Sequence, residues 1–179
     1  MANLYGRTWT REELASRIGK ESQLGGVRLG QYDDGNARGA RYAEVDTGSG
    51  LAYTVLLDRG MDIGVVRYNG ASLVWESPTG PLHPAYFEPE GRGWLRTFHG
   101  GMVVTCGMTT AGAATIEDGE DLGLHGRISH TPAANVWADG AWRGDEYEMF
   151  VRGKMRQAVV FGENLLMDRR IWSRLGESR

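Results

Sequence analysis

Glycine constrains this chain more than any other residue type. It supplies 27 of the 179 residues, and the glycines are spread along the chain without a fixed period. Glycine adopts positive φ at little cost, so such a distribution is typical of many tight turns and bulges between short strands. The intervening runs are short and β-like, and Leu51 to Leu57 is the most continuously apolar of them. We expect about ten strands on this pattern.

The fold class predicted from these runs is all-β, an antiparallel β-sandwich with one short N-terminal helix. The helix is expected within residues 9 to 25, where Thr10 and Glu13 form a capping-box pair and Leu14 and Ile18 share a face. Because that face is narrow, residues 1–26 are interpreted as a helical cover. Residues 27–179 are interpreted as the β-sandwich domain.

Turn signals divide the sandwich into strands. Asn69-Gly70 is the strongest hairpin signal in the sequence. Further turns are predicted at Gly140 and at Gly153, with strands on either side of each. Residues 77–92 hold all but one of the five prolines and are therefore predicted to form a surface loop.

Composition limits the classes of partner. The net charge of −3 gives no electrostatic reason to expect nucleic acid or an anionic membrane. No apolar run approaches the ~20 residues that span a bilayer, and the N-terminus lacks the pattern of a signal peptide. The single cysteine fits a reducing compartment. These features predict a cytoplasmic protein with no nucleic-acid or membrane partner.

The stretch from Gly93 to Ala133 carries most of the residues capable of chemistry. Two of the four histidines are each followed by glycine, at His99-Gly100 and His125-Gly126, and an arginine lies close to each. A glycine beside such a side chain allows a ligand to approach the backbone closely. An arginine supplies several fixed donors for hydroxyl, carboxylate or phosphate oxygens.

Several motifs together resemble a bacterial branch of the aldose 1-epimerase (galactose mutarotase-like) superfamily, from about Gly26 to Gly176. The motifs are Asp58-Arg59-Gly60-Met61-Asp62-Ile63, Gly93-Trp94-Leu95-Arg96 with Gly100-Gly101, Thr105-Cys106-Gly107, Leu122 to Ser129 with Pro132-Ala133, and Gln157 to Leu165.

The resemblance implies a β-supersandwich whose concave face binds a monosaccharide. Members of the superfamily interconvert the α and β anomers without a metal or organic cofactor. A histidine acts as general acid toward the ring oxygen and a glutamate acts as base on the anomeric hydroxyl. The implied partner is a monosaccharide or sugar derivative, and the implied cofactor set is empty.

Carried over to this chain, the resemblance gives substrate-binding roles to His125, Arg127 and Arg96. His125 with Gly126 and Arg127 is similar to the segment that holds the sugar hydroxyls. Arg96, ahead of Gly100-Gly101, resembles the arginine that precedes a Gly-Gly turn at the pocket floor in related mutarotases. We add His99, for its following glycine, and Trp94, whose ring could stack on a sugar face.

The resemblance places the acid histidine and the base glutamate beyond Arg179. The sequence therefore predicts the N-terminal half of a mutarotase-like domain, with an incomplete sandwich and no turnover of sugar. Unpaired sheet edges then predict self-association. A non-catalytic carbohydrate-binding module is the alternative function.

The remaining candidates have simpler structural interpretations. His83 and His130 are predicted to be solvated loop residues, and Cys106, in a β-like run from Met102, a buried core residue. Asp58, Arg59 and Asp62 are interpreted as an ion-pair network at a tight turn. No metal site is predicted, because no His-x-His, His-x-x-x-His or Cys-x-x-Cys spacing occurs.

Overall fold

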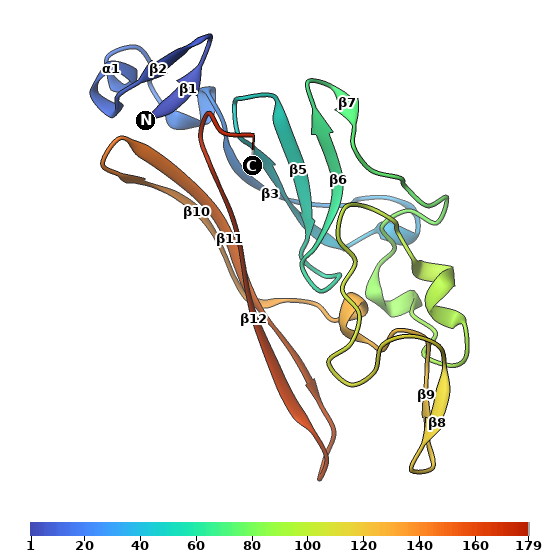
Figure 1. Cartoon of the computed structure of the whole chain (residues 1–179). Helices are drawn as coiled ribbons and strands as arrows, with labels where there is room; N and C mark the ends of the chain where they lie inside the picture. Colours follow the sequence, from blue (N-terminus) through green and yellow to red (C-terminus); the bar gives the residue numbers. More distant parts are fainter. Residues whose placement is uncertain (179) are drawn as a thin grey trace.

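Two antiparallel sheets face each other in the computed structural model, which describes residues 1–178 (Figure 1). The first sheet has the order β3-β4-β5-β6-β7 and the second the order β10-β11-β12. The strands of the first sheet are β3 (Gly26–Gln31), β4 (Arg41–Asp46), β5 (Leu51–Leu56), β6 (Asp62–Tyr68) and β7 (Ala71–Ser72). Those of the second are β10 (Ala134–Arg143), β11 (Glu146–Ala158) and β12 (Asn164–Arg174). The all-β sandwich prediction is confirmed.

The core lies between the two sheets and follows the alternation of the strands. Val45, Tyr53 and Val55 point inward from the first sheet, and Val151 and Met155 point inward from β11. Each is less than 9% exposed. Because side chains alternate across a strand, the other face of each sheet remains outside the sandwich.

A small N-terminal unit covers one end of the sandwich, close to the C-terminus (Figure 1). It consists of the hairpin β1 (Ala2–Leu4) and β2 (Arg7–Trp9), followed by α1 (Arg11–Ala15). The predicted capping box is present, since Thr10 accepts from the backbone N–H of Glu13 while the Glu13 carboxylate accepts from that of Thr10. The helix is shorter than expected, and a separate 3₁₀ turn occupies Glu21–Gln23.

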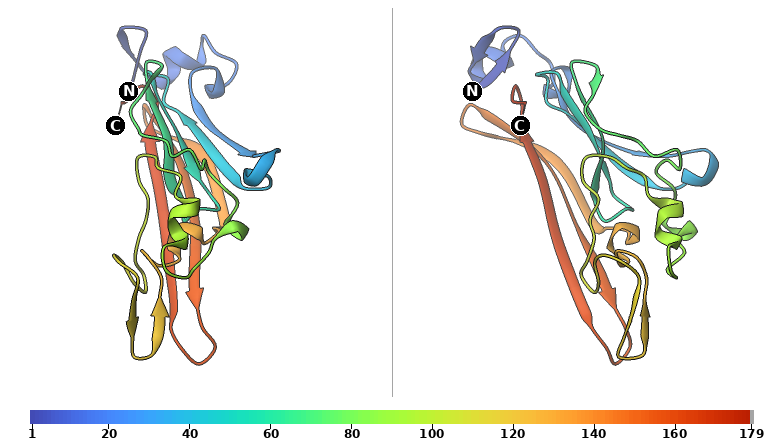
Figure 2. Two further views of the ribbon diagram at one scale, coloured as in Figure 1. Left: turned by 90° about the vertical axis from the view of Figure 1, so that its right-hand side faces the viewer. Right: turned by 45° about the vertical axis from the view of Figure 1, so that its right-hand side comes forward.

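The segment between β7 and β10 contains little regular structure and packs beside the lower part of the sandwich (Figure 2). Its elements are the hairpin β8 (Thr115–Glu117) and β9 (Glu120–Leu122) and the 3₁₀ turns Pro84–Tyr86, Gly93–Thr97 and Ile128–His130. Outside this segment, the 3₁₀ turn Gly35–Ala37 joins β3 to β4. The predicted proline-rich loop is therefore confirmed. The predicted strand from Met102 is wrong, because only an isolated bridge joins Val103 to Ile63.

Two predicted turns are wrong for a common reason. Gly140 and Gly153 lie inside the continuous strands β10 and β11. At each position a neighbouring side chain fills the space of the absent Cβ: the Tyr147 ring covers Gly140, and Met61 Sδ lies against Gly153. These glycines allow close packing. The chain reverses instead near Gly144, where φ is +61°, and again between Ala158 and Asn164.

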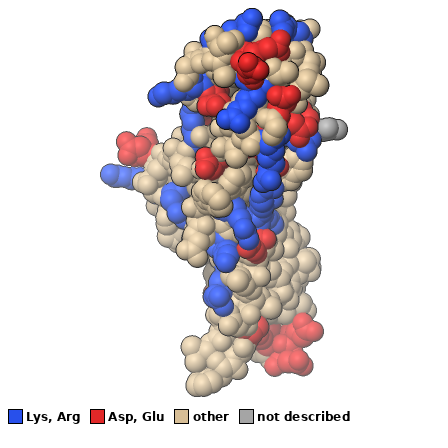
Figure 3. Space-filling model, turned by 90° about the vertical axis from the view of Figure 1, so that its left-hand side faces the viewer, with Lys and Arg blue, Asp and Glu red and all other residues tan. Residues whose placement is uncertain are grey.

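The outer face of the second sheet carries many basic side chains along its strands (Figure 3). Several of them are paired with carboxylates on adjacent strands, as in Arg152–Asp168 at 2.6 Å and Arg174–Glu146 at 3.1 Å. Within residues 1–178, no helix has both the length and the apolar character needed to cross a membrane.

Candidate functional site

Arg59, in the turn between β5 and β6, contacts three loops. Its side chain is 2% exposed and donates from Nε to the Ser129 carbonyl at 2.7 Å, from Nη1 to that of Leu82 at 3.0 Å and from Nη2 to that of Thr97 at 2.7 Å. Burial lowers the pKa of Arg59 to about 10, with a smaller opposing effect from Asp62. The guanidinium therefore fixes the segment from the proline-rich loop to the His125 turn.

Asp58, Arg59 and Asp62 do not form the predicted ion-pair network with one another. Asp58 instead accepts from Arg41, with Oδ1 2.5 Å from Nη2. Oδ1 of Asp62 accepts from the backbone N–H of Thr105 at 2.9 Å. The three residues share a tight turn, but each joins it to a different part of the molecule.

His130 is buried beside Arg59, so its prediction as a solvated residue is wrong. Nε2 lies 2.9 Å from Arg59 Nη2 and 2.6 Å from Thr97 Oγ1, and Nδ1 lies 3.1 Å from Ser129 Oγ. Because Arg59 can only donate, Nε2 carries the lone pair and Nδ1 carries the proton. Burial, followed by repulsion from Arg59 and His99, lowers the pKa of His130 to about 2. The imidazole is neutral at physiological pH.

Trp94 belongs to the same buried group. It is 5% exposed, and its Nε1 donates to Ser129 Oγ at 2.9 Å. Its ring stacks on Phe98 at 4.9 Å and meets the His125 ring edge-on at 4.7 Å. These ring contacts place Trp94 beside the His125 turn.

The His125-Gly126 turn is fixed by backbone contacts. His125 has φ of +59°, and its Nδ1 accepts from the N–H of Gly112 at 3.2 Å. Gly126 has φ of +74°, and a Cβ added there would lie 2.7 Å from the Thr110 carbonyl oxygen. Only glycine fits this position without a shift. The turn thereby presents Arg127 at the surface.

A hollow of about 450 Å³ lies beside this turn. Its lining includes Gly126 and Arg127 from this turn and residues from the end of β11. Its further lining includes Phe87, Glu120, Asp121, Arg156, Gln157 and Glu163. Within residues 1–178, the Arg127 guanidinium has neither a hydrogen-bond nor an ion-pair partner. The hollow therefore combines free donors with several carboxylate acceptors.

Gln157 is the most informative residue of this hollow, and the sequence analysis did not select it. It is 8% exposed, and neither its Oε1 nor its Nε2 has a hydrogen-bond partner among the described residues. An unpaired buried amide costs about 1–3 kcal/mol. The available signal was the alternation along β11, where Met149, Val151 and Met155 point inward and Gln157 continues that face.

Arg96 and His99 lie away from the hollow. Arg96 is on the surface with its side chain 73% exposed, and its Nε is 3.1 Å from Oε2 of Glu88. His99 is 5% exposed and lies beside Asp62 instead. Of the predicted binding residues, only Arg127 lines the hollow, and His125 and Trp94 support the turn behind it.

Cys106 is exposed, so its predicted place in the core is wrong. Burial and the nearby Asp62 carboxylate both raise its pKa. Among residues 1–178, no three His, Cys, Asp or Glu side chains gather closely enough to hold a metal ion.

The chain is similar to parts of two solved structures. A “putative aldose 1-epimerase” from Klebsiella pneumoniae subsp. pneumoniae MGH 78578 is similar over 95% of this chain and 48% of its own, with 25% identity and a TM-score of 0.79. Galactose 1-epimerase from Lactobacillus acidophilus NCFM is similar over 82% of this chain and 44% of its own, with 15% identity and a TM-score of 0.47. The chain thus spans about half the length of either structure.

Comparison with curated proteins gave no match. The model of the family described as a domain of unknown function, DUF4432, matches residues 37–179. That match includes both sheets' central strands, the His125 turn and Gln157, and it covers most of the sequence. The chain is therefore a member of the DUF4432 family.

Proposed function

We propose that this protein is aldose 1-epimerase-like and binds a monosaccharide in the hollow between Arg127 and Gln157. The observation that carries the proposal is the buried Gln157 amide, which has no partner within residues 1–178. Both atoms are enclosed, so a ligand hydroxyl would reach this unused donor and acceptor through a shift of the lining side chains. The similarity to the Klebsiella pneumoniae structure supports a sugar as that ligand.

The lining of the hollow suits sugar hydroxyls, which both donate and accept. Arg127 offers donors only, Glu120 and Glu163 offer acceptors, and Gln157 offers both. The volume of about 450 Å³ falls within the range of about 300–1,000 Å³ that is usual for small-molecule sites. The arginine supplies directional hydrogen bonds, and the carboxylates disfavour a strongly anionic ligand.

Interconversion of anomers would require an acid and a base on one bound sugar. None of the histidines lines the hollow: His130 is buried and neutral, His125 contacts Gly112 and Trp94, and His99 lies beside Asp62. This arrangement favours the second candidate function, a carbohydrate-binding module without turnover. Under that alternative the same hollow binds sugar and the anomeric equilibrium is reached no faster.

One experiment distinguishes the two functions. Exchange NMR on α-D-glucose and α-D-galactose measures the rate of anomer interconversion with and without the full chain. Acceleration supports the epimerase. Binding detected by calorimetry without acceleration supports the module, and the absence of both would exclude either function for these sugars.

We also propose that the protein self-associates through the second sheet. β12 is an edge strand of that sheet and, within the described residues, pairs only with β11. The free edge of a strand of this length presents N–H and C=O groups to another chain. Sedimentation velocity would show a concentration-dependent increase in mass, whereas a single monomeric species at all concentrations would contradict it. The cytoplasmic location expected from the single cysteine stays a prediction.

A further inference from the structure

Asp62 and His99 form a second unpaired polar group, remote from the Arg127 hollow. Oδ2 of Asp62 lies 3.7 Å from Nε2 of His99, and neither atom has a hydrogen-bond partner in residues 1–178. The side chains are 0% and 2% exposed. This separation is longer than a hydrogen bond, so a modest movement would join them. Buried polar atoms left in this state need an explanation.

The Asp62 carboxylate is held from its other side. Oδ1 accepts from the N–H of Thr105 at 2.9 Å and from its hydroxyl at 2.5 Å, and Nη1 of Arg169 lies 3.4 Å away. Oδ2 therefore remains for the imidazole alone. A carboxylate facing Nε2 favours the proton on that nitrogen and leaves the lone pair on Nδ1.

Nδ1 of His99 is free to meet a ligand. It has no hydrogen-bond partner within residues 1–178, and unlike Nε2 it is not fully enclosed. His99 lines a cavity of about 30 Å³ together with Tyr32 and Glu76. That volume suits a single water or one hydroxyl group. The His99 side chain thus borders a space for one oxygen atom, and Asp62 lies beside its Nε2.

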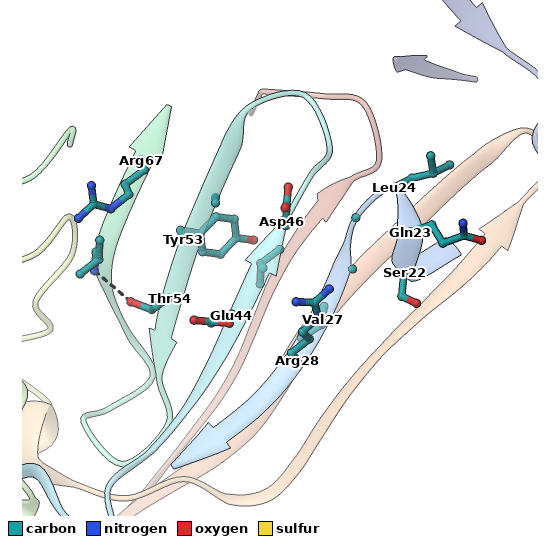
Figure 4. A pocket seen from close by; sticks show the side chains of 15 residues that line it. Ser22, Gln23, Leu24, Val27, Arg28, Glu44, Asp46, Tyr53, Thr54 and Arg67 are labelled. Carbon is teal, nitrogen blue, oxygen red and sulfur yellow. Dashed lines mark hydrogen bonds between the residues drawn. The ribbon is translucent and has the colours of Figure 1, made fainter. Parts of the chain in front are cut away.

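The small cavity adjoins a larger hollow of about 380 Å³ on the first sheet, and the two share Thr54 and Val65 as lining residues. In this hollow Arg28, Glu44 and Thr54 occupy consecutive positions across β3, β4 and β5. Figure 4 shows the Glu44 side chain between those of Thr54 and Arg28.

The floor of this larger hollow can bind hydroxyl groups. Neither Arg28 nor Glu44 has an ion-pair partner among the described residues, although they are cross-strand neighbours. A guanidinium donates and a carboxylate accepts, so the pair could hold two neighbouring hydroxyls. Small residues, Gly26 and Ala52 among them, leave room above the sheet.

We propose that this face of the first sheet contains a second small-molecule site, for a neutral polyhydroxylated ligand that binds Arg28 and Glu44 and extends into the small cavity, where one hydroxyl donates a hydrogen bond to His99. It shares no lining residue with the Arg127 hollow. The inference therefore stands independently of the proposed monosaccharide site. Asp62 acts here as a positioning residue, because it contacts the imidazole and not the ligand.

The probe for this site is myo-inositol, a cyclic polyol without an anomeric centre. In the full chain labelled with ¹⁵N at histidine, His99 should show the Nε2–H tautomer, and titration with myo-inositol should shift its Nδ1 resonance. The exposed double variant Arg28→Gln/Glu44→Gln should weaken that response at least tenfold. Arg127→Ala, which alters the other hollow, should leave it unchanged.

Two outcomes would overturn the proposal. One is a His99 resonance that does not respond to myo-inositol at tens of millimolar. The other is a response that survives the double variant and disappears in Arg127→Ala, which would assign the ligand to the first hollow. Loss of glucose binding in Arg127→Ala, with the inositol response intact, would support two independent sites.

Discussion

Nη2 of Arg59 lies 2.9 Å from Nε2 of His130, and both side chains are buried. A permanent cation thus donates to a neutral imidazole. Thr97 and Ser129 satisfy the remaining imidazole contacts and also connect it to Trp94. This buried network fixes the loop that presents Arg127, and it accounts for much of the rigidity expected at the candidate site.

Removing Arg59 should destabilise the whole chain. Arg59→Ala leaves the carbonyls of Leu82, Thr97 and Ser129 without their donor. We expect the free energy of unfolding to fall by about 3–5 kcal/mol, as for other disrupted buried networks. Urea denaturation measures it, with the exposed Arg38→Ala as the matched control. Equal stabilities of the two variants would show that the buried contacts contribute little.

Protonation of His130 should destabilise the protein in acid. Its folded pKa of about 2 lies below the unfolded value of about 6.5. The unfolded state therefore binds the extra proton, and the stabilisation present above pH 6.5 is lost as the pH falls below it. At pH 5 the loss attributable to His130 is about 2 kcal/mol.

A pair of variants isolates this contribution. His130→Asn should show a smaller fall in the free energy of unfolding between pH 7 and pH 5 than the natural chain. His83→Asn, at a partly exposed histidine, should show the same fall in unfolding free energy between pH 7 and pH 5 as the natural chain. Parallel pH profiles for all three proteins would mean that His130 titrates normally in the folded state.

Gln157→Met should change stability and binding in opposite directions. The substitution keeps the length of the side chain and removes an unpaired buried amide, so we expect a gain of about 1 kcal/mol in unfolding free energy. Sugar affinity should fall at least tenfold, because the hollow loses a donor and an acceptor. Denaturation and calorimetry on one preparation measure both, and a destabilised variant with normal affinity would contradict the assigned role.

The two glycines Gly126 and Gly119 offer a matched test of the His125 turn. Both have positive φ, at +74° and +83°, but a Cβ at Gly126 meets the Thr110 carbonyl at 2.7 Å and one at Gly119 meets nothing within 4 Å. Gly119→Ala should lower the free energy of unfolding by about 1–2 kcal/mol, which is the cost of the backbone strain alone. Gly126→Ala should lower the free energy of unfolding further, and it should also weaken sugar binding because it displaces Arg127. Similar losses in both variants would argue against tight packing at the turn.

The fold class followed from local signals, whereas the strand boundaries did not. Asn69-Gly70 forms the hairpin between β6 and β7 because both residues have positive φ, at +49° and +83°. Gly140 and Gly153 carry the same residue type, yet they serve packing inside strands. Only the tertiary neighbours, Tyr147 and Met61, distinguish the two uses.

The candidate site was predicted in part for similar reasons. The glycine after His125 was expected to admit a ligand, whereas the Thr110 carbonyl lies in that space, and Arg127 lines the neighbouring hollow. His130 was misjudged because nothing local reveals a partner such as Arg59, which lies 71 residues earlier in the chain. Gln157 was missed because its significance depends on the absence of partners, which only the assembled structure reveals.

The most direct test of the central claim is sugar binding at the Arg127 hollow. Titration of the ¹⁵N-labelled chain with D-glucose and D-galactose should shift the Gln157 side-chain amide and the Gly126 backbone amide together. Arg127→Ala should reduce the affinity at least tenfold, and Arg96→Ala, at the exposed Glu88 pair, should not. Shifts confined to other regions, or equal affinities for the two variants, would contradict the account.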